Sequence, residues 1–235
     1  LGLGGPFLWV AGRAIDVMLA IGKFVSDLPG AVQTVASAPD VALPIAFLGV
    51  LFLCLWQGKG RWLGLPFAAA VLIWPRAPVP DVWIGDGGTT AAYVQDQDAI
   101  ILRPGVRTFA SDVWSRRRGL RSLPRETIGW TCDRFSCVPD GDRSPIALWW
   151  GRRAPTQDQL STLCSRAQIV SVRAIITTLP SSCSGRLVLD GTDHAQGGAV
   201  ELWKTETGWR AIWTSDVRGT RPWSKASPGS MNQTQ

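Results

Sequence analysis

Residues 41–56 have the sequence VALPIAFLGVLFLCLW, sixteen residues without a charge. A second uncharged run, WLGLPFAAAVLIW, occupies residues 62–74, after a short polar loop that contains Lys59 and Arg61. A soluble helix normally shows one polar face, and neither run has one. The two runs therefore predict a pair of membrane helices joined by a tight loop.

The expected transmembrane hairpin covers residues 41–57 and 61–74. Each run is shorter than the roughly 20 residues of a typical span. A buried helical hairpin of a soluble protein is the alternative, with a kink at Pro66 in its second helix. The cations of the loop favour a cytoplasmic loop, which places the chain from Val79 onward on the outer side of the membrane.

Residues 7–28 are a mixed segment rather than a clean apolar run. Four charges interrupt it: Arg13, Asp16, Lys23 and Asp27. The spacing predicts a helix that lies at the membrane interface or packs inside a larger membrane bundle. The chain begins on Leu1 within an apolar stretch, without a charged segment typical of a signal peptide, and we interpret this as a truncated start.

Closely spaced prolines in PRAPVP, residues 75–80, favour an extended connector. We therefore expect a membrane region at 1–78, a soluble envelope-facing domain at 79–223 and a disordered tail at 224–235, where polar residues dominate. The whole chain has 235 residues and carries 24 Lys and Arg against 18 Asp and Glu, a net charge of +6 at pH 7.

The soluble part contains four of the five cysteines: Cys132, Cys137, Cys164 and Cys183. An even number in loop-like surroundings predicts disulfides. Four cysteines allow three connectivities, and the one that joins neighbours in the sequence pairs Cys132 with Cys137 and Cys164 with Cys183. A zinc site built from all four is the alternative, although no C-x-x-C spacing occurs. Disulfides would require an oxidising compartment. Cys54 lies in the first apolar run and is interpreted as a small hydrophobic residue.

Short apolar runs between turn residues predict strands in the soluble part. They fall at residues 81–83, 91–94, 99–102, 146–150, 169–175 and 187–189, and at 199–204 and 209–213, which would form a hairpin. Helical spacing occurs at 109–118 and 156–166. The expected fold class is a membrane α-helical segment followed by an α/β (α+β) sandwich-like soluble domain.

Six consecutive positions at the end of the predicted helix 109–118 contain four arginines: Arg116, Arg117, Arg118 and Arg121. Such a cluster beside Trp114 suits contact with a nucleic-acid backbone or with acidic lipid. A solvated helix C-terminus, whose cations complement the helix dipole, is the alternative. Arginine beside tryptophan recurs in two more places: Trp149–Trp150 with Arg152–Arg153, and Arg218 and Arg221 with Trp223.

Asp190, Asp193 and His194 offer two carboxylates and the single imidazole of the chain within one turn. They could form a metal or general-base site, or an Asx-type turn without catalytic function. One histidine without a second cluster does not build a two-metal hydrolase. The sequence also contains no Gly-rich phosphate loop and no serine elbow. We therefore expect no metal and no cofactor.

Seven motifs spread over most of the chain carry a family resemblance. They are DLPGAV (27–32), FLCLWQGKGRWLGLP (52–66), PDVWIGDGGTTAA (80–92), LRPGVRTFASDVWSRRRG (102–119), CDRFSC (132–137), LVLDGTDHAQGGAVEL (187–202) and RGTRPW (218–223). The chain resembles the C-terminal part of ComEC-type DNA-internalization competence proteins, in their alphaproteobacterial form. The resemblance implies part of a multi-pass channel in the bacterial inner membrane that takes up single-stranded DNA during natural transformation.

Many members of that family end in a metallo-β-lactamase-like nuclease domain, and residues 83–102 look like its opening strands. The metal motif H-x-H-x-D-H that should follow is missing. The resemblance therefore implies a degenerate, non-catalytic domain on the periplasmic side. The implied partners are single-stranded DNA, the lipid bilayer and the rest of the channel, and a homo-oligomer is allowed.

Two other functions remain open at this point. One is a residual metal-dependent nuclease that uses Asp190, Asp193 and His194. The other is a purely structural domain that stabilises the channel without touching DNA. In the non-catalytic interpretation, Arg116, Arg117, Arg118 and Arg121 contact the DNA backbone.

Overall fold

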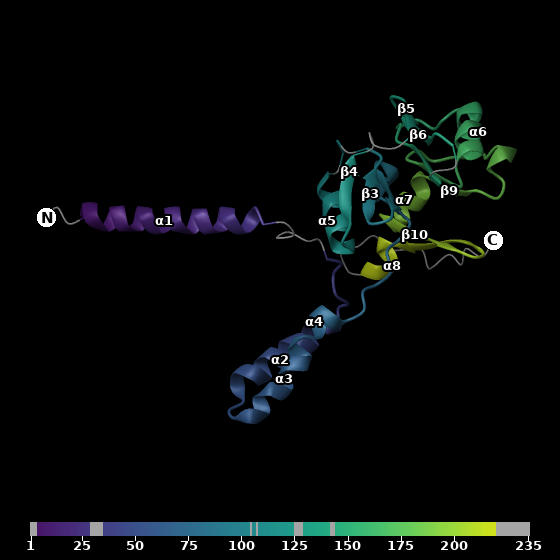
Figure 1. Ribbon diagram of the computed structural model, residues 1–235. Helices are drawn as coiled ribbons and strands as arrows, with labels where there is room; N and C mark the ends of the chain where they lie inside the picture. Colours follow the sequence, from purple (N-terminus) through teal and green to yellow (C-terminus); the bar gives the residue numbers. More distant parts are fainter. Residues whose placement is uncertain are drawn as a thin grey trace. The chain divides into compact units, whose positions relative to one another are not determined.

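A computed structural model describes residues 4–28, 35–103, 105–106, 108–124, 129–141 and 144–219 (Figure 1). The chain divides into two compact units, Leu1–Val35 and Ala36–Gln235. The predicted tail at 224–235 and the last residues of the RGTRPW motif lie outside the described residues. The predicted boundary near residue 78 stays a prediction.

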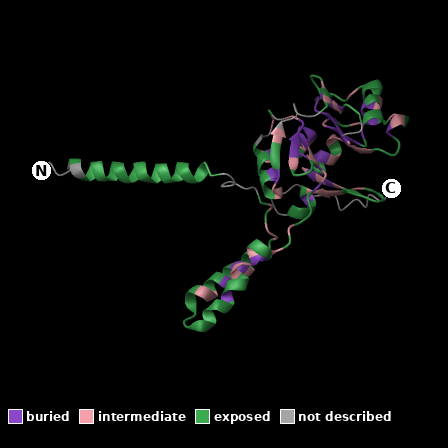
Figure 2. Cartoon of the chain, in the orientation of Figure 1, coloured by how far each residue is buried: buried purple, intermediate pink, exposed green. Residues whose placement is uncertain are grey.

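The first unit contains one helix, α1 (Gly4–Ser26), where the sequence predicts a helix at 7–28. Its described side chains are exposed along its whole length (Figure 2). Ser26 Oγ donates to the carbonyl of Lys23 at 2.9 Å in its last turn.

The second unit begins with a helical hairpin. The helix α2 (Ala42–Leu55) packs against α3 (Gly64–Ala68) and α4 (Ala70–Ile73), with the 3-10 turn η1 (Lys59–Leu63) between them. Glycines allow the close approach: a Cβ on Gly49 would lie 2.3 Å from the backbone nitrogen of Ala68. The hairpin of the sequence interpretation therefore forms, but from short helices.

The predicted membrane segment is wrong. Among the described residues, no helix is both long enough and apolar enough to cross a bilayer. The helix α1 is long but contains Arg13, Asp16 and Lys23, and α2 is apolar but has 14 residues. At 1.5 Å per residue such a helix covers about 21 Å, less than the roughly 30 Å of a hydrocarbon core.

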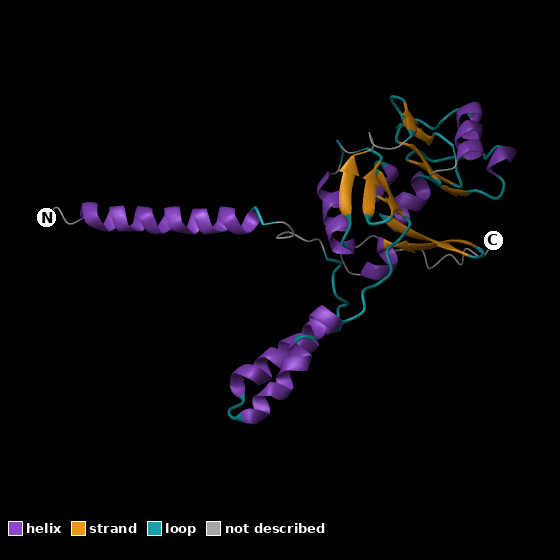
Figure 3. Cartoon of the chain, in the orientation of Figure 1, coloured by secondary structure: helices purple, strands orange, loops and turns teal. Residues whose placement is uncertain are grey.

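The rest of the unit is an α+β fold with two sheets (Figure 3). The first sheet has the order β11-β10-β1-β2-β3-β4. Its strands are β1 (Val82–Ile84), β2 (Ala91–Gln95), β3 (Asp98–Ile101), β4 (Arg121–Pro124), β10 (Val200–Thr205) and β11 (Gly208–Trp213). Among these described strands, only the β3–β4 pair is parallel, and β1 lies between β2, the next strand along the chain, and β10, which comes much later.

The second sheet has the order β5-β6-β7-β8-β9. Its strands are β5 (Trp130–Cys132), β6 (Ser136–Pro139), β7 (Ile146–Trp149), β8 (Ile169–Val172) and β9 (Leu187–Leu189). The strands β7, β8 and β9 are parallel, so their carboxyl ends meet at one edge of the sheet.

Helices cover the outer faces of the two sheets. Alternate side chains of β1 show the layering: Val82 and Ile84 belong to the core shared by both sheets, and Trp83 packs with Trp114 of α5 (Thr108–Arg118). On the second sheet, β7 and β8 pack their outer side chains against α6 (Gln157–Arg166). The remaining short helices are η2 (Asp86–Gly88), η4 (Ser181–Cys183), α7 (Gly191–Gly197) and α8 (Thr214–Arg218).

Two cysteine pairs form disulfides, as the sequence-local pairing predicts. Cys132 and Cys137 face each other across β5 and β6, with Cα atoms 4.1 Å apart. Cys164 of α6 bonds to Cys183 of η4 over a separation of 19 residues. The pairs belong to different core clusters, so the four sulfurs do not form one zinc site.

Candidate nucleic-acid interface

The predicted arginine cluster sits at the end of α5, and one of its members is held by a carboxylate. Glu201 accepts from the Nε of Arg118 at 2.9 Å and from the indole Nε1 of Trp114 at 2.7 Å. Arg118 and Glu201 are both largely buried, with 22% and 18% of their side chains exposed. Arg118 therefore holds α5 against β10 rather than pointing freely into solvent.

The other three arginines differ in their surroundings. Arg121 forms a bidentate pair with Asp98, at 2.8 and 3.2 Å, and Arg116 lies 3.8 Å from Asp112 at an exposed site. The side chain of Arg117 is exposed and has no ion pair or hydrogen bond to any described residue. The structure therefore does not gather the four into one free basic patch, and their role in DNA contact stays a prediction.

A different set of cations lies where the parallel strands of the second sheet end. Trp149 closes β7 and Val172 closes β8, and the backbone nitrogen of Arg173 donates to the carbonyl of Trp149 at 2.9 Å. Because parallel strands end at the same edge of a sheet, Trp150 and Arg173 lie side by side at that edge. The first sheet adds Arg103, which follows β3. We call Arg103, Trp150 and Arg173 the strand-end cluster.

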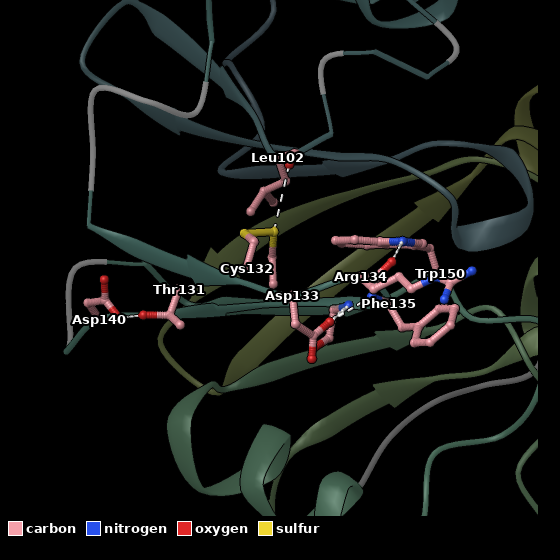
Figure 4. The surroundings of a disulfide bond; sticks show 10 residues. Leu102, Thr131, Cys132, Asp133, Arg134, Phe135, Asp140 and Trp150 are labelled. Atoms are coloured by element: carbon pink, nitrogen blue, oxygen red, sulfur yellow. Dashed lines mark hydrogen bonds between the residues drawn. A yellow bond between two sulfur atoms is a disulfide. The ribbon is translucent and has the colours of Figure 1, made fainter.

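The ring of Trp150 is held firmly beside the β5–β6 turn. Its Nε1 donates to the carbonyl of Arg134 at 3.0 Å, and its backbone nitrogen donates to the carbonyl of Phe135 at 2.8 Å. The disulfide of Cys132 closes this turn, and Figure 4 shows it beside the indole and the turn residues. The Arg134 guanidinium in turn lies 5.2 Å from the Phe135 ring. The Arg134–Phe135 pair is exposed, whereas the Trp150 ring is buried, with 8% of its surface accessible.

Arg103 lies over the Trp150 ring, with its Cζ 4.9 Å from the centroid. One guanidinium nitrogen donates to the carbonyl of Thr89 at 3.3 Å. Partial burial, and then the like charge of Arg173, lower the pKa of Arg103. Among the described residues, no carboxylate forms an ion pair with Arg103 or Arg173. Two like charges held together in this way repel each other, and an anion placed between them would be stabilised.

A buried polar pair fills the interior behind this cluster. Nε2 of His194 lies 3.0 Å from Oγ of Ser171, and both residues are almost completely buried. Gly88, at φ +57°, packs against the pair: a Cβ there would lie 2.8 Å from Cδ2 and Nε2 of the imidazole. The edge of Trp213 lies on another side of the ring, 5.9 Å between centroids. Ser171 is therefore closed off from a substrate.

The imidazole is neutral at neutral pH. Burial lowers the pKa of His194 from 6.5 to about 4, against the opposing effects of the Gly198 backbone and of the charges on Asp190 and Asp86. The buried Nδ1 of the imidazole has no hydrogen-bond partner among the described residues.

The carboxylates of the alternative nuclease site serve the backbone of α7. Asp190 caps this helix: its side chain accepts from the backbone nitrogens of Thr192 at 2.8 Å and of Ile176 at 2.9 Å. Asp193 reaches back to the nitrogen of Asp190 at 2.9 Å, and burial raises the pKa of Asp193. This capping box confirms the Asx-type turn. Across the described residues, no three His, Cys, Asp or Glu side chains are grouped to hold a metal.

No family model, curated protein or solved structure matches this chain. The resemblance to ComEC-type proteins therefore rests on the sequence motifs alone. The expected likeness of the fold to a metallo-β-lactamase domain gains no support.

Sequence reasoning missed the strand-end cluster. It paired Trp149 and Trp150 with their neighbours Arg152 and Arg153, whereas the cation over Trp150 comes from Arg103, 47 positions earlier. The available signal was one arginine directly after the strand predicted at 99–102 and another inside the strand predicted at 169–175. Only the pairing of strands within each sheet, and the packing of the sheets, brings those strand ends together.

Proposed function

We propose that this chain supplies a non-catalytic domain that contacts single-stranded DNA on the periplasmic side of the bacterial inner membrane, as part of a channel for DNA uptake. The observation that carries the proposal is Arg103 stacked on Trp150 beside Arg173, without a carboxylate partner in the described part of the chain. Neighbouring cations without a carboxylate partner suit the phosphates of a single strand, and the buried Trp150 ring holds the Arg103 guanidinium in place.

Three further features support the proposal. The net charge of +6 favours a polyanionic partner. Two disulfides fit an oxidising compartment such as the periplasm. The carboxylates of Asp190 and Asp193 are engaged by backbone nitrogens, and His194 is buried against Ser171, so these three residues offer no accessible base for a cleavage reaction.

The test is binding of a fluorescently labelled oligothymidylate to the oxidised full chain, measured by anisotropy. Arg103→Gln should weaken binding by about 10- to 150-fold, since a charge-assisted contact contributes roughly 1.5–3 kcal/mol. Arg210→Gln is the matched control, because it removes the same charge from an exposed side chain of β11 that belongs to neither arginine set. Equal losses in the two variants would reduce the interaction to net charge and contradict the assignment of the strand-end cluster.

The non-catalytic part needs its own test. The same oligonucleotide is incubated with the chain and Mg²⁺, Mn²⁺ or Zn²⁺, and its length is followed on a denaturing gel. Intact oligonucleotide is the expected result. Metal-dependent cleavage that disappears in His194→Gln would instead favour the residual nuclease.

A further inference from the structure

A cavity of about 250 Å³ lies at the other end of the two-sheet fold. The parallel strands β7, β8 and β9 begin here, and Pro145, Gln168 and Arg186 directly precede them. The first sheet contributes Asp81 before β1, and Lys204 from the end of β10. Since parallel strands begin and end at opposite edges, this cavity is separate from the strand-end cluster.

The cavity has an excess of positive charge. Arg166, Arg186 and Lys204 line it, against the single carboxylate of Asp81 among its described residues. That carboxylate already accepts from the backbone nitrogen of Lys204 at 2.7 Å. The side chains of the three cations form no hydrogen bond or ion pair to any described residue. They are free to bind an anion, and phosphate is an anion that several cations lining one cavity can hold.

Two aromatic rings complete the lining. Tyr93 of β2 and Trp209 of β11 are half-buried, and both pack against the core shared by the two sheets. Burial, together with the charges of Asp81 and Asp96, raises the pKa of Tyr93, so its hydroxyl remains a donor at neutral pH. Rings fixed on strands offer a surface for a planar group to stack on.

The size of the cavity limits its ligand. Its volume is a little below the roughly 300–1,000 Å³ of sites for drug-sized ligands. A single phosphorylated base fits this limit better than a dinucleotide cofactor does. The alternative is a water-filled hollow in which the three cations are simply solvated.

We infer that this cavity is a nucleotide site, with Arg166, Arg186 and Lys204 holding a phosphate and Trp209 or Tyr93 stacking on the base. The inference does not rest on the proposed function, because none of these residues belongs to the strand-end cluster. The same chemistry has two sources: a free nucleoside monophosphate, or one nucleotide of a DNA strand.

The test is calorimetric titration of the oxidised full chain with 2′-deoxyadenosine 5′-monophosphate, 2′-deoxyadenosine and inorganic phosphate in parallel. The monophosphate should bind more tightly than either fragment. Arg166→Gln and Arg186→Gln should each weaken it about tenfold, the effect of one charge-assisted contact. Arg210→Gln is the matched control: it removes an exposed cation from the residue after Trp209, outside the cavity lining.

An oligothymidylate competition identifies the source. If the oligonucleotide displaces the monophosphate from the wild-type chain but does not displace the residual monophosphate from Arg166→Gln, a DNA strand uses the cavity. Failure to displace shows that a free nucleotide is the ligand. Absent binding of the monophosphate, or equal affinity in Arg166→Gln, Arg186→Gln and Arg210→Gln, overturns the inference. Thermal melting of each variant confirms that it folds.

Discussion

The guanidinium of Arg103, which follows a strand of the first sheet, lies 4.9 Å from the ring of Trp150, which follows a strand of the second. The contact joins the two sheets at the end where His194 and Ser171 are buried. An interface built in this way depends on how the sheets pack, and not on the charge of one helix.

Removal of the Glu201 carboxylate should destabilise the fold. Glu201→Ala leaves Arg118 and the Nε1 of Trp114 without their acceptor, and an unsatisfied, largely buried donor costs about 1–3 kcal/mol. Urea unfolding followed by tryptophan fluorescence measures the change in the free energy of unfolding. Asp112→Ala is the control, because its exposed pair with Arg116 contributes about 0.5 kcal/mol or less. Similar losses in both variants would show that Glu201 has no special role.

Gly88→Ala should be strongly destabilising. A methyl group there lies 2.8 Å from the His194 ring, on a backbone at φ +57°. Overpacking of about 1–3 kcal/mol then adds to the roughly 1–2 kcal/mol of left-handed backbone strain. Gly185→Ala, at φ +74° with nothing within 4 Å of the new Cβ, isolates the backbone contribution. The comparison uses the same urea unfolding, and equal losses would mean that the imidazole moves aside freely.

Stability should fall in mild acid because of His194. Its pKa is about 4 in the folded chain, against 6.5 in an exposed histidine, so the unfolded chain binds the proton more readily. The free energy of unfolding therefore decreases as the pH falls from 6.5 towards 4, by roughly 3 kcal/mol. The raised pKa of Asp193 has the opposite effect on the free energy of unfolding: its protonated carboxyl stabilises the fold at low pH, and this contribution is lost as the pH rises.

Urea unfolding at several pH values measures this dependence. His194→Gln, whatever its own stability, should remove the fall between pH 6.5 and 4. An unchanged slope in this variant would show that other groups set the acid sensitivity.

Thiol counting tests the disulfides and their compartment. The denatured chain should react with one equivalent of thiol reagent, at Cys54, and with five after reduction, since all five cysteines lie in the described part. Reduction should also destabilise the fold by about 2–4 kcal/mol for each disulfide, with the larger share from Cys164–Cys183, which closes the longer loop. Five reactive thiols without reductant in protein isolated from the periplasm would contradict the pairing.

Local patterns in the sequence predicted the local structure well. The helix expected at 109–118 is α5 (Thr108–Arg118), and the hairpin expected at 199–204 and 209–213 is β10 with β11. Periodicity and turn residues act over a few positions, and these elements depend on little else. The same patterns predicted a membrane-spanning helix at 41–57, and this was wrong because the apolar helix that forms there, α2, has only 14 residues.

The contacts of the candidate site could not be predicted in this way. Arg118 meets Glu201 across 83 positions, because β10 pairs with β1 beside the sheet face that α5 covers. Whether an arginine is free or paired depends on such long-range pairing, which composition does not record. The sequence therefore indicated that the arginines at the end of α5 were available to DNA, although Arg118 and Arg121 are paired with carboxylates. It gave no such indication for Arg103.

The salt dependence of single-stranded DNA binding tests the central claim most directly. For the wild-type chain, the logarithm of the association constant should fall linearly with the logarithm of salt concentration. The slope for Arg103→Gln should be shallower by about 0.7, the value for one phosphate contact on a single strand, and that for Arg210→Gln should match the wild type. Binding that is absent, that does not depend on salt, or that keeps the wild-type slope in Arg103→Gln would contradict the account.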